Sequence, residues 1–339
     1  MTQNNVLEKL PGKAWIATLL LALGLVSLAL LPAGCGGNTI QPDDKPKIAG
    51  ILLQEDQFYR LIEYGMEAAA EQHGVDLLLG NSFGSLDKEI SLIDTYISRG
   101  VSAILVAPLS VKASIPTLKR AHDEGIPVIT YDGYIEADFP RSDIMSDQVA
   151  LGRSTGKVAV EYIRQNLGGK AKLALIEYIS LAPEQGGRRV RGFREEIDKL
   201  PGVEIVAEQD AWLAPQAADV VERILTGHPD VQIIWAANEG GTVGAVTAVR
   251  SSGKTGQVVV FGTDMSEQLA DFLLTEDNIL QAVTGQKPYD IGFSTVAAAV
   301  KALKGEDVEK HVALAGILFT RQRPEEVEEY KKVLQRLSQ

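Results

Sequence analysis

Three aspartates stand at or just beyond the ends of apolar runs that have the composition of buried strands. Asp132 ends "IPVITYD" and Asp264 ends "VVVFGTD". Asp56 follows the run "KIAGILL", and two aromatic residues, Phe58 and Tyr59, come directly after it. A carboxylate accepts hydrogen bonds from neighbouring hydroxyl groups, and a ring offers a flat apolar surface. This combination suits a ligand such as a sugar, which carries hydroxyls on its edge and C–H groups on its faces.

Each of these residues also has a structural explanation. Aspartate at a strand–helix junction is commonly a helix N-cap, and Phe58 and Tyr59 are of the type that packs at a helix start. Any one position alone would favour capping. The recurrence of a carboxylate at similar strand ends favours ligand contact at Asp132 and Asp264, and to a lesser degree at Asp56.

The elements around these residues alternate between apolar runs and amphipathic helical patterns. The predicted strands are "KIAGILL", "VDLLLG", "VSAILVAP", "IPVITYD", "KLALIEY", "VEIVAEQ", "VQIIWAAN", "QVVVFGTD" and "NILQAVTG". Continuous apolar strands separated by helices indicate parallel sheets covered on both faces. We therefore expect an α/β protein with doubly wound parallel sheets.

Two segments of the chain share one plan. "VSAILVAPLSVKASIPTLKRAHDEGIPVITYDG" and "VQIIWAANEGGTVGAVTAVRSSGKTGQVVVFGTD" each contain a strand, a polar or proline stop, a helix, and a strand that ends in aspartate. Pro108 corresponds to Asn238, and Asp132 to Asp264. The repetition predicts two similar lobes. Ligands bind at the carboxyl ends of strands in open α/β sheets, so we expect a polar cleft between the lobes.

Composition excludes several classes of function. The 339 residues carry a formal net charge of −12, which disfavours binding to nucleic acid. Four scattered histidines and a single cysteine indicate neither a metal site nor an internal disulfide. No cofactor is expected.

The N-terminal segment has the form of an export signal. Lys9 and Lys13 precede the uncharged run "AWIATLLLALGLVSLALLPAGC". Small residues before Cys35 resemble a bacterial lipoprotein lipobox, although Pro32 stands where that box usually has leucine. We expect a signal peptide over 1–34, lipidation of Cys35 and a tether over 35–46. An uncleaved membrane anchor is the alternative, since the run is about long enough to span a bilayer.

A second motif suggests a different class of protein. Residues 80–84 read Gly-x-Ser-x-Gly after a predicted strand, as in a hydrolase nucleophile elbow. A serine hydrolase using Ser82 is a remote alternative, because no glycine-rich oxyanion loop precedes it. Neither His228 nor His311 follows a strand end in a suitable loop.

From about Lys47 to Thr320 the chain resembles the type I periplasmic sugar-binding proteins, the ribose- and galactose-binding group related in fold to LacI-type repressors. The segments that carry the resemblance, in order, are "QEDQFYRLIEYGMEAAAEQHG", "IPVITYD", "SDQVALG", "RRVRGF", "HPDVQIIWAANEGGTVGAV", "VVVFGTDM" and "GQKPYDIG". In that group the protein is the solute receptor of an ABC importer.

The resemblance implies a set of ligand contacts. Carried over by position, they are the polar residue Asp56, the sugar-stacking rings Phe58 and Tyr59, the second-lobe aromatic Trp212, and the polar contacts Asp132, Arg189, Asn238, Asp264 and Gln286. Two departures argue against ribose: Asp56-Gln57 replaces the usual Asn-Pro, and Gly133 stands where ribose binders carry arginine. The galactose-type calcium loop is not visible.

The resemblance also implies the organisation of the exported part. Residues 47–146 with 287–316 would form lobe 1, and 147–286 with 317–339 lobe 2, with crossovers near Ser146, Gln286 and Gly316. The expected protein is a monomeric, lipid-anchored sugar-binding subunit of an ABC importer that closes on its ligand by a hinge and performs no covalent chemistry. A sensor subunit that signals to a membrane kinase or chemoreceptor is the alternative. A LacI-type regulator is disfavoured because an export signal precedes Lys47.

Overall fold

The computed structural model describes residues 45–181 and 183–337, so the predicted signal peptide and Cys35 lie outside the described residues. Lys45–Gln339 forms one compact unit, and the four hydrophobic clusters that stabilise it all lie within it. A protein beginning at Gly36 therefore keeps the whole core. Among the described residues, no helix has the length and apolar character needed to cross a membrane.

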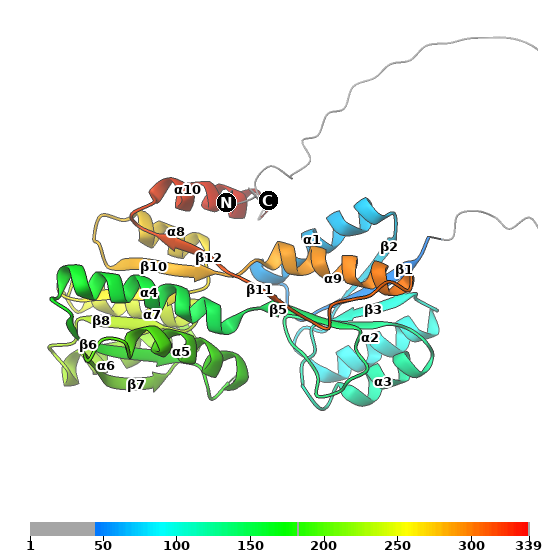
Figure 1. Cartoon of the computed structure of the whole chain (residues 1–339), viewed down its shortest axis with the longest axis horizontal. Coiled ribbons are helices and arrows are strands. Elements are labelled where there is room, and N and C mark those ends of the chain that lie inside the picture. The colour runs from blue at the N-terminus through cyan, green and yellow to red at the C-terminus, as the bar shows by residue number, and fades with distance from the viewer. Residues whose placement is uncertain (1–44, 182, 338–339) are drawn as a thin grey trace, which may run out of the picture. The chain divides into compact units, whose positions relative to one another are not determined.

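Two six-stranded sheets organise the unit, and Figure 1 shows helices on both sides of each sheet. In the first sheet every neighbouring pair of strands is parallel. Its order is β11 (His311–Leu314), β5 (Ser142–Ser146), β4 (Val128–Tyr131), β3 (Ala103–Val106), β1 (Lys47–Leu52) and β2 (Asp76–Asn81). The second sheet is parallel except for its antiparallel edge strand β12. Its order is β12 (Ile317–Thr320), β10 (Leu280–Gly285), β9 (Val259–Thr263), β8 (Ile233–Ala236), β6 (Lys170–Glu177) and β7 (Gly202–Asp210).

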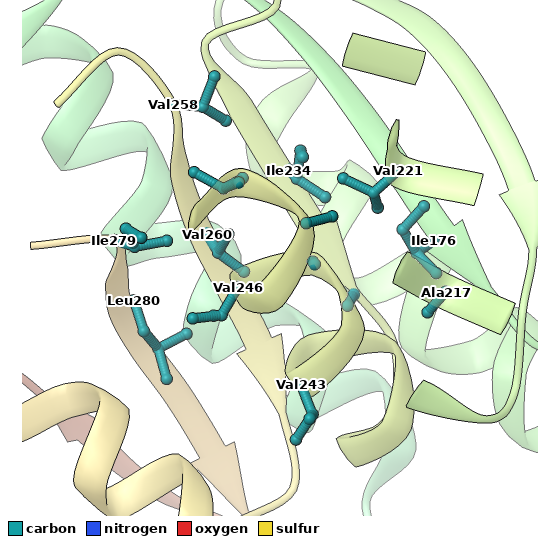
Figure 2. Packing of buried hydrophobic residues seen from close by; sticks show 14 of the residues in the cluster. Ile176, Ala217, Val221, Ile234, Val243, Val246, Val258, Val260, Ile279 and Leu280 are labelled. Atoms are coloured by element: carbon teal, nitrogen blue, oxygen red, sulfur yellow. The ribbon is translucent and has the colours of Figure 1, made fainter. Parts of the chain in front are cut away.

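Ten helices cover the sheets of the described residues: α1 (Gln57–His73), α2 (Leu86–Ser98), α3 (Ile115–Asp123), α4 (Gln148–Asn166), α5 (Pro183–Ile197), α6 (Ala214–Gly227), α7 (Glu239–Ser251), α8 (Glu267–Leu274), α9 (Pro288–Leu303) and α10 (Pro324–Leu337). Each face of each sheet has its own hydrophobic cluster. Figure 2 shows one of them, where Val246 of α7 lies beside Val260 of β9 and Leu280 of β10. The predicted α/β fold with two parallel-sheet lobes is confirmed.

The chain passes between the sheets at three points. It leaves β5 at Ser146 and enters α4, which packs on the second sheet. It leaves β10 at Gly285 and enters α9, which packs on the first sheet. The third passage lies between β11 and β12, after Leu314.

Glycines allow close helix pairing in both lobes. In α4, a Cβ added to Gly152 would lie 1.9 Å from the carbonyl oxygen of Arg189 in α5, and one added to Gly192 of α5 would lie 2.0 Å from that of Val149. Gly65 of α1 and Gly292 of α9 form the equivalent contact in the other lobe, with distances of 2.0 Å each. Backbone meets backbone at these crossings, so no side chain can be accommodated unless the helices separate.

We expect Gly152→Ala to lower the free energy of unfolding by about 1–3 kcal/mol, the usual cost of overpacking a core. Gly187→Ala is the matched control, because nothing lies within 4 Å of its Cβ position in α5. There, the better helix propensity of alanine should stabilise the protein by about 0.5–1 kcal/mol. Urea unfolding of both variants measures the difference. Equal effects of the two substitutions would show that the close crossing is not a constraint.

Candidate functional site

Asp132 and Asp264 occupy equivalent places in the two lobes. Each follows the last residue of a central strand, β4 or β9, and each has a left-handed backbone, with φ of 53° and 70°. Each also donates its backbone N–H to the next strand: Asp132 to the Ile144 oxygen and Asp264 to the Thr284 oxygen, both at 2.9 Å. This conformation is uncommon for any residue except glycine, and it concentrates at functional sites. Neither residue caps a helix: the element after Asp132 is the strand β5, and the N-cap of α8, which follows Asp264, is Ser266.

Arg189 of α5 forms a largely buried ion pair with Asp264. Its Nη1 lies 3.0 Å from Asp264 Oδ2, and the two side chains are 4% and 23% exposed. The same guanidinium donates to the Ala237 carbonyl at 2.9 Å and to Gln148 Oε1 at 2.6 Å. Burial disfavours the charge of Arg189, but Asp264 and the other partners outweigh it and raise the pKa above its ordinary value. The arginine is thus held rigidly in its charged form.

Asp132 accepts a hydrogen bond from a buried tyrosine of its own lobe. The hydroxyl of Tyr59 in α1 donates to Asp132 Oδ2 at 2.6 Å. Burial raises the pKa of Asp132 from its ordinary 3.8 to about 6, opposed by the Tyr59 hydrogen bond and by the charge of Arg189, while Asp264 raises it further. Residues of both lobes therefore act on this carboxylate. Gln185 of α5 also donates directly across the lobes to the Asp132 carbonyl, at 3.1 Å.

Asn238 and Gln286 are both engaged with the protein. Asn238 is the N-cap of α7, accepts from the Gly241 N–H at 3.1 Å and donates to the Trp212 carbonyl at 2.8 Å. Gln286, directly after β10, donates to Asp264 Oδ1 at 2.8 Å. The structure thus brings both residues beside the Arg189–Asp264 pair, with part of their hydrogen-bonding capacity already used.

The aromatic residues and Asp56 have different surroundings, and only the ring of Tyr59 departs from the expected stacking role. Asp56 caps α1, accepting from the Tyr59 N–H at 3.0 Å. The ring of Tyr59 is only 6% exposed and packs in the core, so its contribution to the site is its hydroxyl and not a stacking face. Phe58 lies edge-on to that ring, with centroids 5.4 Å apart. Trp212, which is 43% exposed, meets Tyr178 edge-on at 5.1 Å.

Two residues of the site were not predicted from the sequence. Tyr178 directly follows β6, and its ring centroid lies 5.5 Å from the Arg189 guanidinium carbon. The strand-end rule that selected Asp132 would have found it. Gln148, which orients Arg189, lies within the segment "SDQVALG", but no feature of that segment marks its partner.

Tyr59→Phe should weaken ligand binding several-fold at pH 7, because without this hydrogen bond a larger fraction of Asp132 is protonated and its carboxylate is no longer held in one orientation. Because the lost bond lowers the pKa of Asp132, its removal raises that pKa, and the affinity should begin to fall at a higher pH as the solution is acidified. Titration calorimetry between pH 5 and 8 measures both effects. Tyr330→Phe, whose ring packs on Phe319 in the other lobe, is the control and should leave affinity unchanged. An unaltered pH profile in Tyr59→Phe would contradict the assignment.

The hydrolase motif does not form an elbow. Ser82 lies between β2 and α2, but its hydroxyl is buried and donates to the Leu52 carbonyl at 3.2 Å, so it is not exposed as a nucleophile. Within residues 45–181 and 183–337, no three histidine, aspartate, glutamate or cysteine side chains gather as a metal site requires.

Comparison with known proteins gives the family. The protein-family model described as "periplasmic binding protein domain" matches residues 52–307. The chain belongs to this family. It is 30% identical over 282 residues to the ABC transporter periplasmic-binding protein YphF of Escherichia coli K12, covering 81% of this chain and 85% of that protein. It is 31% identical to the ribose import binding protein RbsB of the same organism, covering 84% and 93%.

A solved structure agrees with this placement. The periplasmic solute-binding protein of an Actinobacillus succinogenes ABC transporter, with bound D-allose, superimposes with a TM-score of 0.74 at 26% identity. The match covers 83% of this chain and all of that one. As a periplasmic binding protein, the chain has the two-lobed architecture of that family, whose named members here are binding proteins and not enzymes.

Proposed function

We propose that this protein binds a monosaccharide or sugar-like polyol between its lobes and delivers it to the permease of an ABC importer. The observation that carries the proposal is the pair of equivalent aspartates, one on each lobe, with Arg189 acting electrostatically on both. A hydroxyl-rich ligand can donate to the carboxylates and accept from the guanidinium. The importer role is supported by the names of the relatives, which include a ribose import binding protein and an ABC transporter solute-binding protein with bound D-allose.

The proposed polar contacts to the ligand are Asp132 in lobe 1 and Arg189, Asn238, Asp264 and Gln286 in lobe 2. Phe58 and Trp212 are the proposed aromatic contacts. Tyr59 contributes by its hydrogen bond to Asp132, and Asp56 by capping the start of α1. Among the hydrogen bonds of the described residues, Asp132 Oδ1 has no partner, and this atom is the proposed acceptor for a ligand hydroxyl. No covalent step is proposed at any of these residues.

The lobe boundaries are proposed at 47–146 with 287–316 and at 147–286 with 317–339, supported by the sheet to which each strand belongs. Differential affinity of the ligand for the closed form would drive a hinge closure. Cys35 is proposed as the site of a lipid anchor that holds the exported monomer at the membrane surface. Incorporation of a labelled fatty acid into the full chain, and its loss in Cys35→Ser, tests that anchor.

A thermal-shift screen of the protein from Gly36 onward tests the proposed function. The panel comprises pentoses, hexoses, inositols and nucleosides, applied to protein that has been unfolded and refolded to remove bound ligand. A ligand at 100 times its dissociation constant stabilises the protein by about 2.7 kcal/mol. A large shift with one sugar is the expected result. The absence of a shift with any sugar or polyol in the folded protein would refute the proposal.

A further inference from the structure

The buried ion pair of lobe 2 is tied to the segments that connect the lobes. Gln148, the first residue of α4, follows the first passage between the sheets and accepts from Arg189 Nε at 2.6 Å. Gln286, at the second passage, donates to Asp264 Oδ1 at 2.8 Å. Both residues of the ion pair therefore form hydrogen bonds with side chains of the segments that connect the two lobes.

Gln286 also reaches the other sheet. Its Oε1 accepts from the hydroxyl of Ser146 at 2.7 Å, and Ser146 is the last residue of β5. The direction of these bonds is determined by chemistry. A carboxylate only accepts, so Nε2 must face Asp264, and Ser146 must then donate to the remaining oxygen. This series of hydrogen bonds, here called the relay, runs from Ser146 of the first sheet through Gln286 of the second passage to the carboxylate of Asp264.

The three passages are packed against one another at this place. The N–H of Asp147 donates to the Leu314 carbonyl at 2.8 Å, which joins the first passage to the third. A Cβ added to Gly316 would lie 2.7 Å from the Gly285 oxygen, so the third passage lies against the second. Any change in the angle between the lobes must therefore change the backbone dihedral angles of these three passages. Ser146, which is 2% exposed, lies beside them.

We propose that Ser146 is a positioning residue that acts through the proposed ligand contact Gln286 and so couples the orientation of Asp264 to the hinge. A ligand that engages Asp264 orders Gln286 and Ser146, and thereby favours one angle between the lobes. By thermodynamic linkage, a lobe angle that preserves the relay raises the affinity for the ligand by the same factor by which the ligand favours that angle. The inference rests on the proposed function for the ligand, but the relay itself consists of contacts within the protein.

The first test is a double-mutant cycle on ligand affinity. Ser146→Ala should weaken binding 3- to 10-fold, and Ser146→Thr, which keeps the hydroxyl, should restore it. Gln286→Leu should weaken binding further. Because the two residues act in series, adding Ser146→Ala to Gln286→Leu should change the affinity less than twofold. Ser142→Ala is the control, since this serine of the same strand donates to the Glu309 carbonyl and not to the relay. Additive losses would overturn the proposal.

The second test needs no ligand. The protein from Gly36 onward has no native cysteine, so spin labels at Ser98→Cys in α2 and Arg223→Cys in α6 report one distance between the lobes. Ser146→Ala and Gln286→Leu should broaden the distribution of that distance, whereas Ser146→Thr and Ser142→Ala should match the wild type. Identical distributions in all variants would overturn the relay. If the wild type binds no sugar, the proposed function fails, and this measurement still decides the relay.

Discussion

Replacing Asp264 with alanine should abolish ligand binding and also lower the free energy of unfolding by about 3–5 kcal/mol. The variant leaves the Arg189 guanidinium in a site where its side chain is 4% exposed and its ionic partner is gone. Removing one member of a buried ion pair is costly because the other remains as an uncompensated charge. Urea unfolding of the ligand-free protein and titration calorimetry measure the two effects separately.

A double substitution provides the control for this result. In Asp264→Leu with Arg189→Met, both charges are removed, and the loss of stability should be clearly smaller than in Asp264→Ala. Binding should stay absent, because the variant lacks both polar groups. Asp264→Ala protein with wild-type stability would show that Arg189 finds water or another partner and that the pair is not structural.

Asp132→Asn should have the opposite effect on stability, although it occupies the equivalent position. The raised pKa of about 6, against an ordinary 3.8, corresponds to about 3 kcal/mol of penalty for the ionised form in the folded state. That penalty is fully present above pH 6, shrinks as the pH falls through 6, and is absent below 3.8. The asparagine variant should therefore be more stable than the wild type by up to about 3 kcal/mol at pH 7.5, and the difference should vanish near pH 4.

The same substitution should weaken ligand binding roughly 10- to 100-fold, because a hydrogen bond to a charged acceptor contributes about 1.5–3 kcal/mol. Unfolding curves at several pH values and calorimetry at pH 7.5 test both expectations. Asp123→Asn, in an exposed pair with Lys119 on the same lobe, is the control and should change neither quantity appreciably. If Asp132→Asn is less stable than the wild type at pH 7.5, burial does not dominate the energetics of this carboxylate.

The two aspartates differ because of their neighbours, which sequence position does not reveal. Both end equivalent strands and both have a left-handed backbone. Asp264 has a guanidinium 3.0 Å away and a glutamine on its other oxygen. Asp132 has only a neutral hydroxyl on Oδ2. We therefore expect removal of the Asp264 carboxylate to destabilise the fold, because it leaves Arg189 unpaired, and removal of the Asp132 charge to stabilise it.

The predictable part of the fold came from long, regular patterns. The nine apolar runs predicted from the sequence all correspond to strands. In inner strands such as β3 and β8, burial on both faces requires continuous apolar residues. Three further strands, β5, β11 and β12, were missed as strands. "SDIMS" and "HVAL" are short, and their burial alternates or is partial, so neither reads as a buried run. β11 and β12 are edge strands of the two sheets, and β5 lies between β4 and β11, so all three are defined by the strands with which they pair and not by an apolar run of their own.

The sequence by itself determined the two-lobed α/β architecture and the placing of Asp132 and Asp264 at equivalent strand ends, because periodicity and strand-end composition are local properties of the chain. Only the tertiary structure decided what each site residue does. Tyr59 became a buried hydrogen-bond donor instead of an exposed ring, because α1 packs its aromatic face against the first sheet. Gln286 and Ser146, 140 residues apart, met because the chain crosses between the sheets at both. Such contacts between distant segments depend on how whole elements pack, which no local pattern encodes.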